Sequence, residues 1–133
     1  MENETRGHVE GYVKYLLQLE GLLVFCTGLH LYFSSTESSW QMFLILFLFP
    51  DLSFLGYLLG KKVGAFSYNL MHSYILPLFL FQAFWFFSLE AWNFILFIWI
   101  THIGFDRALG YGLKYSKGFA YTHLGILKQF IKS

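Results

Sequence analysis

The chain has 133 residues, a length that suits one domain, and 56% of them are hydrophobic whereas 13% are charged. A soluble domain typically carries about 25% charged residues, and a single small core cannot bury this much apolar surface. The net charge of +1 gives no indication of a nucleic-acid partner. Composition therefore disfavours a soluble globular domain and a nucleic-acid-binding protein, and it favours a chain whose solvent is the lipid bilayer.

Four apolar runs follow in chain order, at residues 16–33, 41–59, 67–87 and 91–109. Each is close to the roughly 20 residues that a membrane-spanning helix needs. The breaks between them are short and polar, so consecutive helices would run antiparallel. The sequence predicts an all-α, polytopic membrane protein. Its polar N-terminal segment (1–15) precedes a four-helix antiparallel transmembrane bundle (16–109).

The remaining segment, residues 110–133, reads GYGLKYSKGFAYTHLGILKQFIKS. It is too short and too polar to span a bilayer. Gly110 and Gly112 are typical of residues that end a helix. Aromatic residues and lysines alternate in the rest, which predicts a short interfacial segment on the cytoplasmic surface of the membrane.

The lysines and arginines all fall on one side of the predicted bundle. The first and third breaks carry only Glu37 and Glu90. Because positive residues are retained on the cytoplasmic side, the sequence predicts a multi-pass protein with both termini cytoplasmic. The positive residues are Arg6, Lys14, Lys61, Lys62, Arg107, Lys114, Lys117, Lys128 and Lys132.

Every predicted span also contains polar side chains, which are costly in a bilayer and usually face the interior of a bundle. At a rise of about 1.5 Å per residue, they fall in one layer, less than about 10 Å thick, near the cytoplasmic side. His102 and Asp106 share one helix face, because their spacing is i and i+4. The members of this polar layer are Glu20, Asp51, Asn69, His72, His102, Asp106 and Arg107.

Two prolines lie beside the polar layer. Pro50 precedes Asp51, and Pro77 follows His72 by five residues. A proline inside a helix removes one backbone hydrogen bond and frees the carbonyl four residues back. We therefore expect both spans to be kinked near their polar residues, which would open a pocket between the helices.

Two histidines with neighbouring carboxylates are a ligand set that suits zinc, manganese or non-haem iron. A divalent ion would offset the excess of negative charge in the layer, and so would protonation of the carboxylates or histidines. The sequence has no close-spaced zinc signature such as H-E-x-x-H. The predicted metal ligands are Asp51, His72, His102 and Asp106.

Other members of the layer have different predicted roles. Glu20 is a further ligand or a general base, and Asp106 and Arg107 complete the predicted catalytic set. The Arg107 side chain points about 100° away from that of Asp106, so it either pairs with a carboxylate on another helix or reaches the inner surface. Asn69 completes the layer, and His123 in the tail is a candidate lid residue over the site.

The strings LLQLEG, FPDLSFLGYLLG, YNLMHSYILP and THIGFDRALGYGLKYSKGF contain these residues. From Leu16 to Gly125 the chain resembles domain-of-unknown-function family 4260, a family of small, mostly bacterial integral membrane proteins. The resemblance implies four membrane helices in a bacterial cytoplasmic membrane and implies no activity. The shared motif residues are Glu20, Pro50, Asp51, Asn69, His72, Pro77, His102, Asp106, Arg107 and His123.

Three functions fit this pattern. The first is a membrane-embedded, metal-dependent enzyme, with hydrolase-like or other acid–base chemistry, acting on a lipid or isoprenoid-like substrate from the cytoplasmic leaflet. The second is a proton- or ion-coupled transporter subunit, which needs a homo-oligomer because four helices enclose little pore. The third is a structural or accessory membrane protein with a buried salt-bridge network.

Overall fold

The structure is a computed structural model that describes residues 7–131, so Arg6 and Lys132 lie outside the described residues. The described chain is mainly helical, and two short strands and a final 3-10 turn follow the last long helix. In chain order the elements are α1 (Gly11–Phe33), α2 (Trp40–Phe47), the 3-10 helix η1 (Phe49–Leu59), α3 (Lys61–His72), α4 (Ile75–Phe86), η2 (Glu90–Trp92), α5 (Asn93–Leu109), β1 (Tyr121–Thr122), β2 (Gly125–Ile126) and η3 (Lys128–Phe130).

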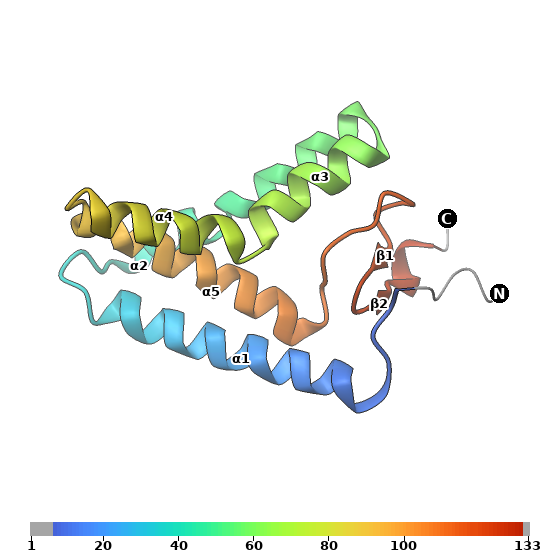
Figure 1. The fold of residues 1–133 in the computed structure, drawn as a ribbon, viewed down its shortest axis with the longest axis horizontal. Helices are drawn as coiled ribbons and strands as arrows, with labels where there is room; N and C mark the ends of the chain where they lie inside the picture. The colour runs from blue at the N-terminus through green and yellow to red at the C-terminus, as the bar shows by residue number, and fades with distance from the viewer. Residues whose placement is uncertain (1–6, 132–133) are drawn as a thin grey trace.

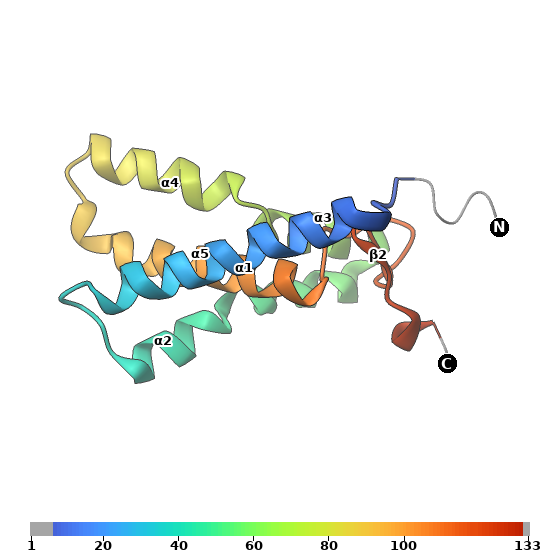
Figure 2. The ribbon, with the colours of Figure 1, turned by 90° about the horizontal axis from the view of Figure 1, so that it is seen from below.

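Helix α5 is central to the fold, because α1, α2 and α4 all pack against it (Figures 1 and 2). The approach of α1 is close because glycines face each other across the interface. A Cβ atom at Gly104 would lie 2.6 Å from the Phe25 backbone nitrogen and 2.7 Å from the Gly21 carbonyl oxygen. Small residues of this kind allow two helix backbones to approach in membrane and soluble proteins alike.

The second apolar run changes helix type beside its proline. Helix α2 ends at Phe47, and the chain continues as η1 with Pro50 in the first turn. Pro50 has no N–H to donate to the Leu46 carbonyl, and the Asp51 N–H bonds to the carbonyl of Leu48 at 3.1 Å, a 3-10 pattern. The predicted interruption of the regular α-helix near Asp51 is confirmed.

The third apolar run is not the single helix over 67–87 that the sequence predicts. Helix α3 begins at Lys61, directly after a turn at Gly60 with φ of +117°, and ends at His72. Ser73 is extended, with φ of −101° and ψ of 152°, and α4 begins at Ile75. Because Pro77 cannot donate to the Ser73 carbonyl, a continuous helix would lose that hydrogen bond, and the chain breaks there instead of kinking.

Side chains of α5 take up the carbonyls released at the end of α3. The Trp99 Nε1–H donates to the Met71 carbonyl at 2.7 Å, and Arg107 Nη2 donates to the His72 carbonyl at 2.8 Å. The last carbonyls of a helix need such partners when they are buried. The broken end of α3 is therefore fixed against α5.

The tail is a folded cap at the end of the molecule where α1 begins (Figure 1). Helix α5 ends at Gly110 in the left-handed conformation, with φ of +89°, as predicted. Strands β1 and β2 pair antiparallel, with Tyr121 opposite Ile126. Asn69 of α3 anchors the tail, since its Nδ2 donates to the Lys114 carbonyl at 2.8 Å and its Oδ1 accepts from the Lys114 N–H at 2.6 Å. The predicted contact of this tail with the membrane surface stays a prediction.

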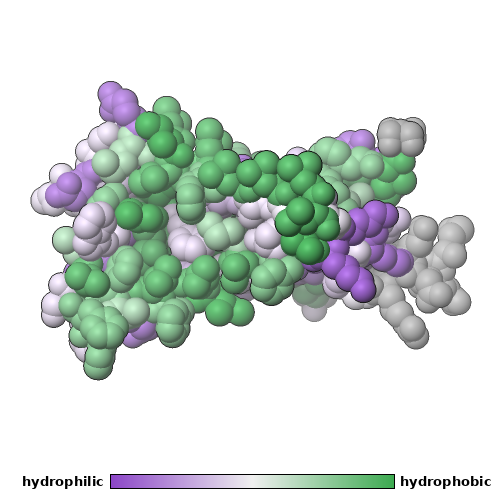
Figure 3. Space-filling view, turned by 90° about the horizontal axis from the view of Figure 1, so that it is seen from above, coloured by the Kyte–Doolittle hydropathy of each residue, from purple (hydrophilic) through white to green (hydrophobic). Residues whose placement is uncertain are grey.

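Within residues 7–131, two helical segments are long and apolar enough to cross a membrane: α1, and α2 together with η1 (Trp40–Leu59). Their mean hydropathies are 1.4 and 2.0, yet only 17% and 11% of the residues in these windows are buried. A core helix of a soluble protein would be mostly buried. Figure 3 shows hydrophobic side chains over the middle of one face and hydrophilic ones toward its two ends. This distribution agrees with the apolar composition from which a membrane protein was predicted.

Candidate metal centre

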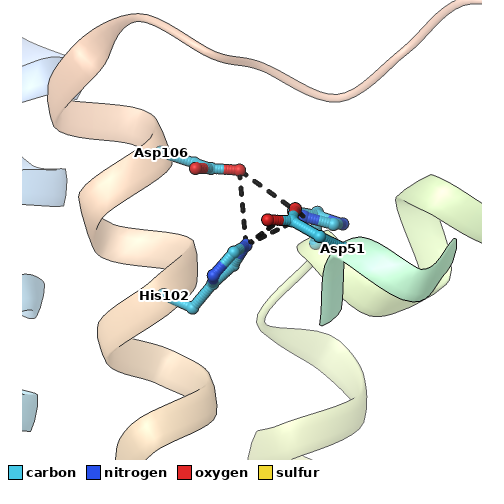
Figure 4. Close-up of side chains that lie close together, drawn as sticks. Asp51, His102 and Asp106 are labelled. Carbon is cyan, nitrogen blue, oxygen red and sulfur yellow. Dashed lines mark hydrogen bonds and ion pairs between the residues drawn. The ribbon is translucent and has the colours of Figure 1, made fainter. Parts of the chain in front are cut away.

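The four predicted metal ligands lie together at the junction of three elements (Figure 4). Asp51 comes from the first turn of η1, His72 from the last turn of α3, and His102 and Asp106 from successive turns of α5. One ligand atom from each residue lies within 4.8 Å of the others. The sequence-predicted set is thus brought together completely.

The five distances that involve a histidine nitrogen are close to those expected around one small ion, and the two carboxylate oxygens lie within 4.8 Å of each other. The two Nε2 atoms of His72 and His102 are 3.1 Å apart. Asp51 Oδ1 lies 3.4 Å from each of them, and Asp106 Oδ2 lies 3.5 and 3.6 Å from them. Four ligands at about 2.0–2.1 Å from a tetrahedral metal would be roughly 3.3–3.4 Å from one another. The group could therefore hold a metal ion.

Tyr68 prepares His72 for such a role. The His72 Nδ1–H donates to the Tyr68 carbonyl at 2.9 Å, which leaves a lone pair on Nε2, the atom that faces the other ligands. The Tyr68 ring stacks on the imidazole at 3.8 Å between centroids, and its hydroxyl donates to Asp106 Oδ2 at 3.3 Å. Supporting contacts of this kind orient histidine ligands in metal sites. In contrast, His102 Nδ1 has no hydrogen-bond partner within residues 7–131.

The group is closed on the histidine side and open on the carboxylate side. The side chains of His72 and His102 are 0% and 2% exposed, whereas those of Asp51 and Asp106 are 39% and 15% exposed. Both carboxylates line a pocket of about 310 Å³, whose other walls are Phe54, Tyr68, Tyr111, Lys114, Phe119 and Phe130. A ligand in this pocket would meet the carboxylate face of the group.

Lys114 is the cation in the wall of this pocket. The residue is 4% exposed, and its ammonium lies 3.9 Å from the centroid of the Phe119 ring and 5.1 Å from that of Tyr68. Burial lowers the pKa of Lys114 to about 8, and the negative charge of Asp106 opposes that effect.

Three other predicted residues have positions that differ from the expected one. Glu20 is exposed and lies outside the metal-ligand group, in the wall of a separate pocket of about 430 Å³. Arg107 and His123 line the same pocket. Arg107 is buried and pairs with no carboxylate of residues 7–131 within 4.0 Å; it donates to the carbonyls of His72 and Tyr111. Arg107 therefore holds His72 in place through the hydrogen bond to the His72 backbone carbonyl.

His123 lines the pocket of Glu20 and is not among the residues that line the pocket of Asp51 and Asp106, where a lid was predicted. Its Nδ1 accepts a hydrogen bond from the Leu113 N–H at 2.9 Å, and its carbonyl accepts from the Val9 N–H at 2.8 Å. Burial and the nearby charge of Arg107 lower the pKa of His123, in agreement with a neutral, accepting imidazole. The tail does cover the metal-ligand group, but with Tyr111, Lys114, Phe119 and Phe130.

Tyr68 and Lys114 were missed as site residues. The spacing of Tyr68, four residues before His72, places the two on one helix face and could have identified it. No pattern in the sequence identifies Lys114, because its place depends on the return of the tail to Asn69.

The family model of a domain of unknown function, DUF4260, matches residues 14–127. The chain belongs to this family. The resemblance deduced from the sequence motifs is confirmed, and the matched range contains the complete metal-ligand group together with Tyr68 and Lys114. A comparison with curated proteins and one with solved structures each found no match.

We predict that the buried Lys114 makes stability depend on pH in the alkaline range. Its pKa of about 8 in the folded protein is below the ordinary lysine value of 10.5, so the cost of burying its charge is complete below pH 8. That cost disappears as the pH rises to 10.5. Wild type should gain stability on the order of 2 kcal/mol relative to Lys114→Met over this interval. Unfolding in detergent, followed across these pH values, measures the difference.

The matched control is Lys62→Met, because Lys62 is an exposed residue of α3. Its difference from wild type should stay constant with pH. Parallel pH profiles for wild type and Lys114→Met would contradict the predicted effect of burial.

Proposed function

We propose that Asp51, His72, His102 and Asp106 bind one divalent metal ion and that the chain is a membrane-embedded, metal-dependent enzyme. The observation that carries this proposal is the convergence of the four ligand atoms within 4.8 Å of one another. The five separations that involve a histidine nitrogen are 3.1 to 3.6 Å. The bond from His72 Nδ1 to Tyr68 supports it, because it commits Nε2 to accept.

Charge also favours an ion in this group. Two carboxylates and two neutral imidazoles carry a charge of −2, which one divalent cation cancels. Nitrogen and oxygen ligands in a tetrahedron suit zinc, and manganese or iron(II) would add water on the open carboxylate side. Double protonation of the histidines is the poorer alternative, since it would place two positive rings with Nε2 atoms 3.1 Å apart.

The proposed setting is a multi-pass bundle in a cytoplasmic membrane with both termini inside. The runs 16–33, 41–59, 67–87 and 91–109 remain the proposed membrane-embedded part, with the third built from the end of α3 and α4. In support, the turn with Lys61 and Lys62 and the tail with its lysines lie toward one end of the molecule (Figure 1). The metal-ligand group would then open to the cytoplasmic leaflet.

The proposed reaction is hydrolysis of an ester bond in a lipid or isoprenoid-like substrate. A bound divalent ion supplies an acidified water molecule and a Lewis acid. Water adds its oxygen to the acyl carbon or phosphorus, the bond to the alcohol oxygen breaks, and that oxygen takes a proton. Asp51 would contribute Oδ1 to the ligand group, and its other carboxylate oxygen, on the exposed side of the group, would accept the proton of the attacking water. Glu20 lies in another pocket and has no part in this step.

The packing of the described residues disfavours the transporter alternative. Beyond the metal-ligand group along α5, Tyr32, Phe43 and Ile98 form an apolar cluster with surrounding phenylalanines and leucines. A proton or ion path would need polar side chains or water there. This packing favours a site that opens to one side.

The metal proposal predicts about one equivalent of zinc, manganese or iron per chain in protein purified without chelators. His102→Gln and Asp51→Asn should each reduce the metal content roughly tenfold or more, since each removes one of the ligands. Elemental analysis of purified protein measures this content. His30→Gln is the control, because His30 is exposed on α1 and outside the group. Metal-free wild type that stays metal-free after incubation with each ion would contradict the proposal.

The enzyme proposal predicts turnover of a membrane lipid. Metal-loaded protein, incubated with a lipid extract, should deplete one lipid class and produce its two hydrolysis products, as mass spectrometry would detect. Asp106→Asn should reduce this turnover by at least about 100-fold, because the variant loses a charged ligand. His30→Gln should keep wild-type turnover. Full metal loading with no lipid hydrolysed would leave a metal-binding membrane protein and contradict the enzyme proposal.

A further inference from the structure

Lys114 and the two carboxylates of the metal-ligand group face the same pocket. The lysine comes from the tail, on the other side of the pocket from α5. An ion held by the group and the Lys114 ammonium would thus be two positive centres in one cavity of about 310 Å³. That volume is enough for a small polar group.

The position of Lys114 is fixed by its backbone. Asn69 makes two hydrogen bonds to the Lys114 peptide groups, and Lys114 also bridges to Thr122 in the tail. The side chain passes between aromatic rings, with the ammonium near Phe119 and Tyr68. The chain therefore holds this cation in the wall of the pocket and keeps it away from bulk water.

No anion within residues 7–131 pairs with this ammonium. The described ion pairs link Asp51 and Asp106 to the histidines, and none involves Lys114. A buried cation is costly unless it is paired, and contacts with aromatic faces recover only part of the cost. An ammonium group without an anionic partner, placed in the wall of a pocket, is available to bind an anionic ligand there.

Charge balance gives the class of ligand. Once a divalent ion cancels the two carboxylates, Lys114 remains as an uncompensated charge on the pocket. Arg107 does not enter this balance, because it lines the separate pocket with Glu20 and donates to the carbonyls of His72 and Tyr111. The metal-loaded group and Lys114 together would therefore carry one net positive charge, which favours an anionic ligand. Phosphate monoesters are close to dianionic at neutral pH, and several of their oxygens can accept from an ammonium and contact a metal at once.

We infer that this pocket binds the phosphate group of a phosphate monoester between the metal ion and Lys114, with the ester's apolar chain against Phe54, Phe119 and Phe130. This inference rests on the proposed metal site and names the substrate class for the proposed hydrolysis. Water would add to phosphorus, the bond between phosphorus and the alcohol oxygen would break, and that oxygen would take up a proton lost by the water, so that inorganic phosphate and the neutral alcohol leave. The reaction needs no oxidant or reductant.

The test measures binding of inorganic phosphate, a product of that reaction, to metal-loaded protein by calorimetry. Wild type is compared with Lys114→Met and Lys114→Gln, which remove the charge, and with Lys114→Arg, which retains it. Lys62→Met is the matched control on an exposed lysine. Loss of one charge-assisted hydrogen bond should weaken phosphate binding by roughly 10- to 100-fold in the Met and Gln variants. Lys114→Arg should stay within about tenfold of wild type, and Lys62→Met should equal it.

Metal content is measured on every sample, so the two proposals fail separately. Absence of metal from wild type defeats the metal site and the inference together. Metal-loaded wild type that does not bind phosphate, or binds it equally well in Lys114→Met, overturns the inference and leaves the metal site intact. Loss of metal from both the Met and Gln variants would assign Lys114 to the structure of the metal site and would also overturn it.

A second arm distinguishes a lipid phosphate from a soluble one. Dodecyl phosphate and ethyl phosphate, each below its micelle concentration, compete with inorganic phosphate for the metal-loaded protein. Contact of the chain with Phe54, Phe119 and Phe130 should make dodecyl phosphate roughly tenfold tighter or more. Equal affinities for the two esters would overturn the assignment of an amphiphilic substrate.

Discussion

The end of α3 is the constraint on which the candidate site depends. The chain cannot continue as a helix past Ser73 without an unmet carbonyl, because Pro77 has no N–H. Trp99 and Arg107 of α5 stabilise the broken end of α3, because they donate hydrogen bonds to the carbonyls of Met71 and His72. The last turn of α3 is thereby held against the turn of α5 that contains His102, and the two imidazoles meet through Nε2.

A second proline supplies the remaining ligand in the same way. Pro50 converts the helix to a 3-10 helix and places Asp51 in its first turn, opposite the two histidines. Both interruptions fall within apolar runs, where an unbonded backbone group is costly and needs a local partner. Broken helices are therefore what allows four polar side chains from three elements to converge while the surrounding side chains stay apolar.

The sequence predicted which side chains converge better than it predicted the elements that hold them. Asp51, His72, His102 and Asp106 could be found because ionisable groups are rare in apolar runs, and a fixed helical rise places them at one depth. Glu20 satisfied the same criteria, but depth says nothing about the direction of a side chain, and Glu20 faces another pocket. The sequence predicted a kinked helix over 67–87, and the structure has two helices separated at Ser73, because a proline is compatible with either a kink or a break. Lys114 could not be predicted, since a long-range contact with Asn69 places it.

The central claim is that two imidazoles and two carboxylates share one metal ion. X-ray absorption spectroscopy of the metal-loaded protein tests it most directly, because it reports the type and distance of the ligand atoms. We predict nitrogen and oxygen ligands at about 2.0–2.1 Å, with the outer-shell signal of two histidines, falling to that of one in His102→Gln. A spectrum without histidine signal, or one unchanged in His102→Gln, would contradict the account.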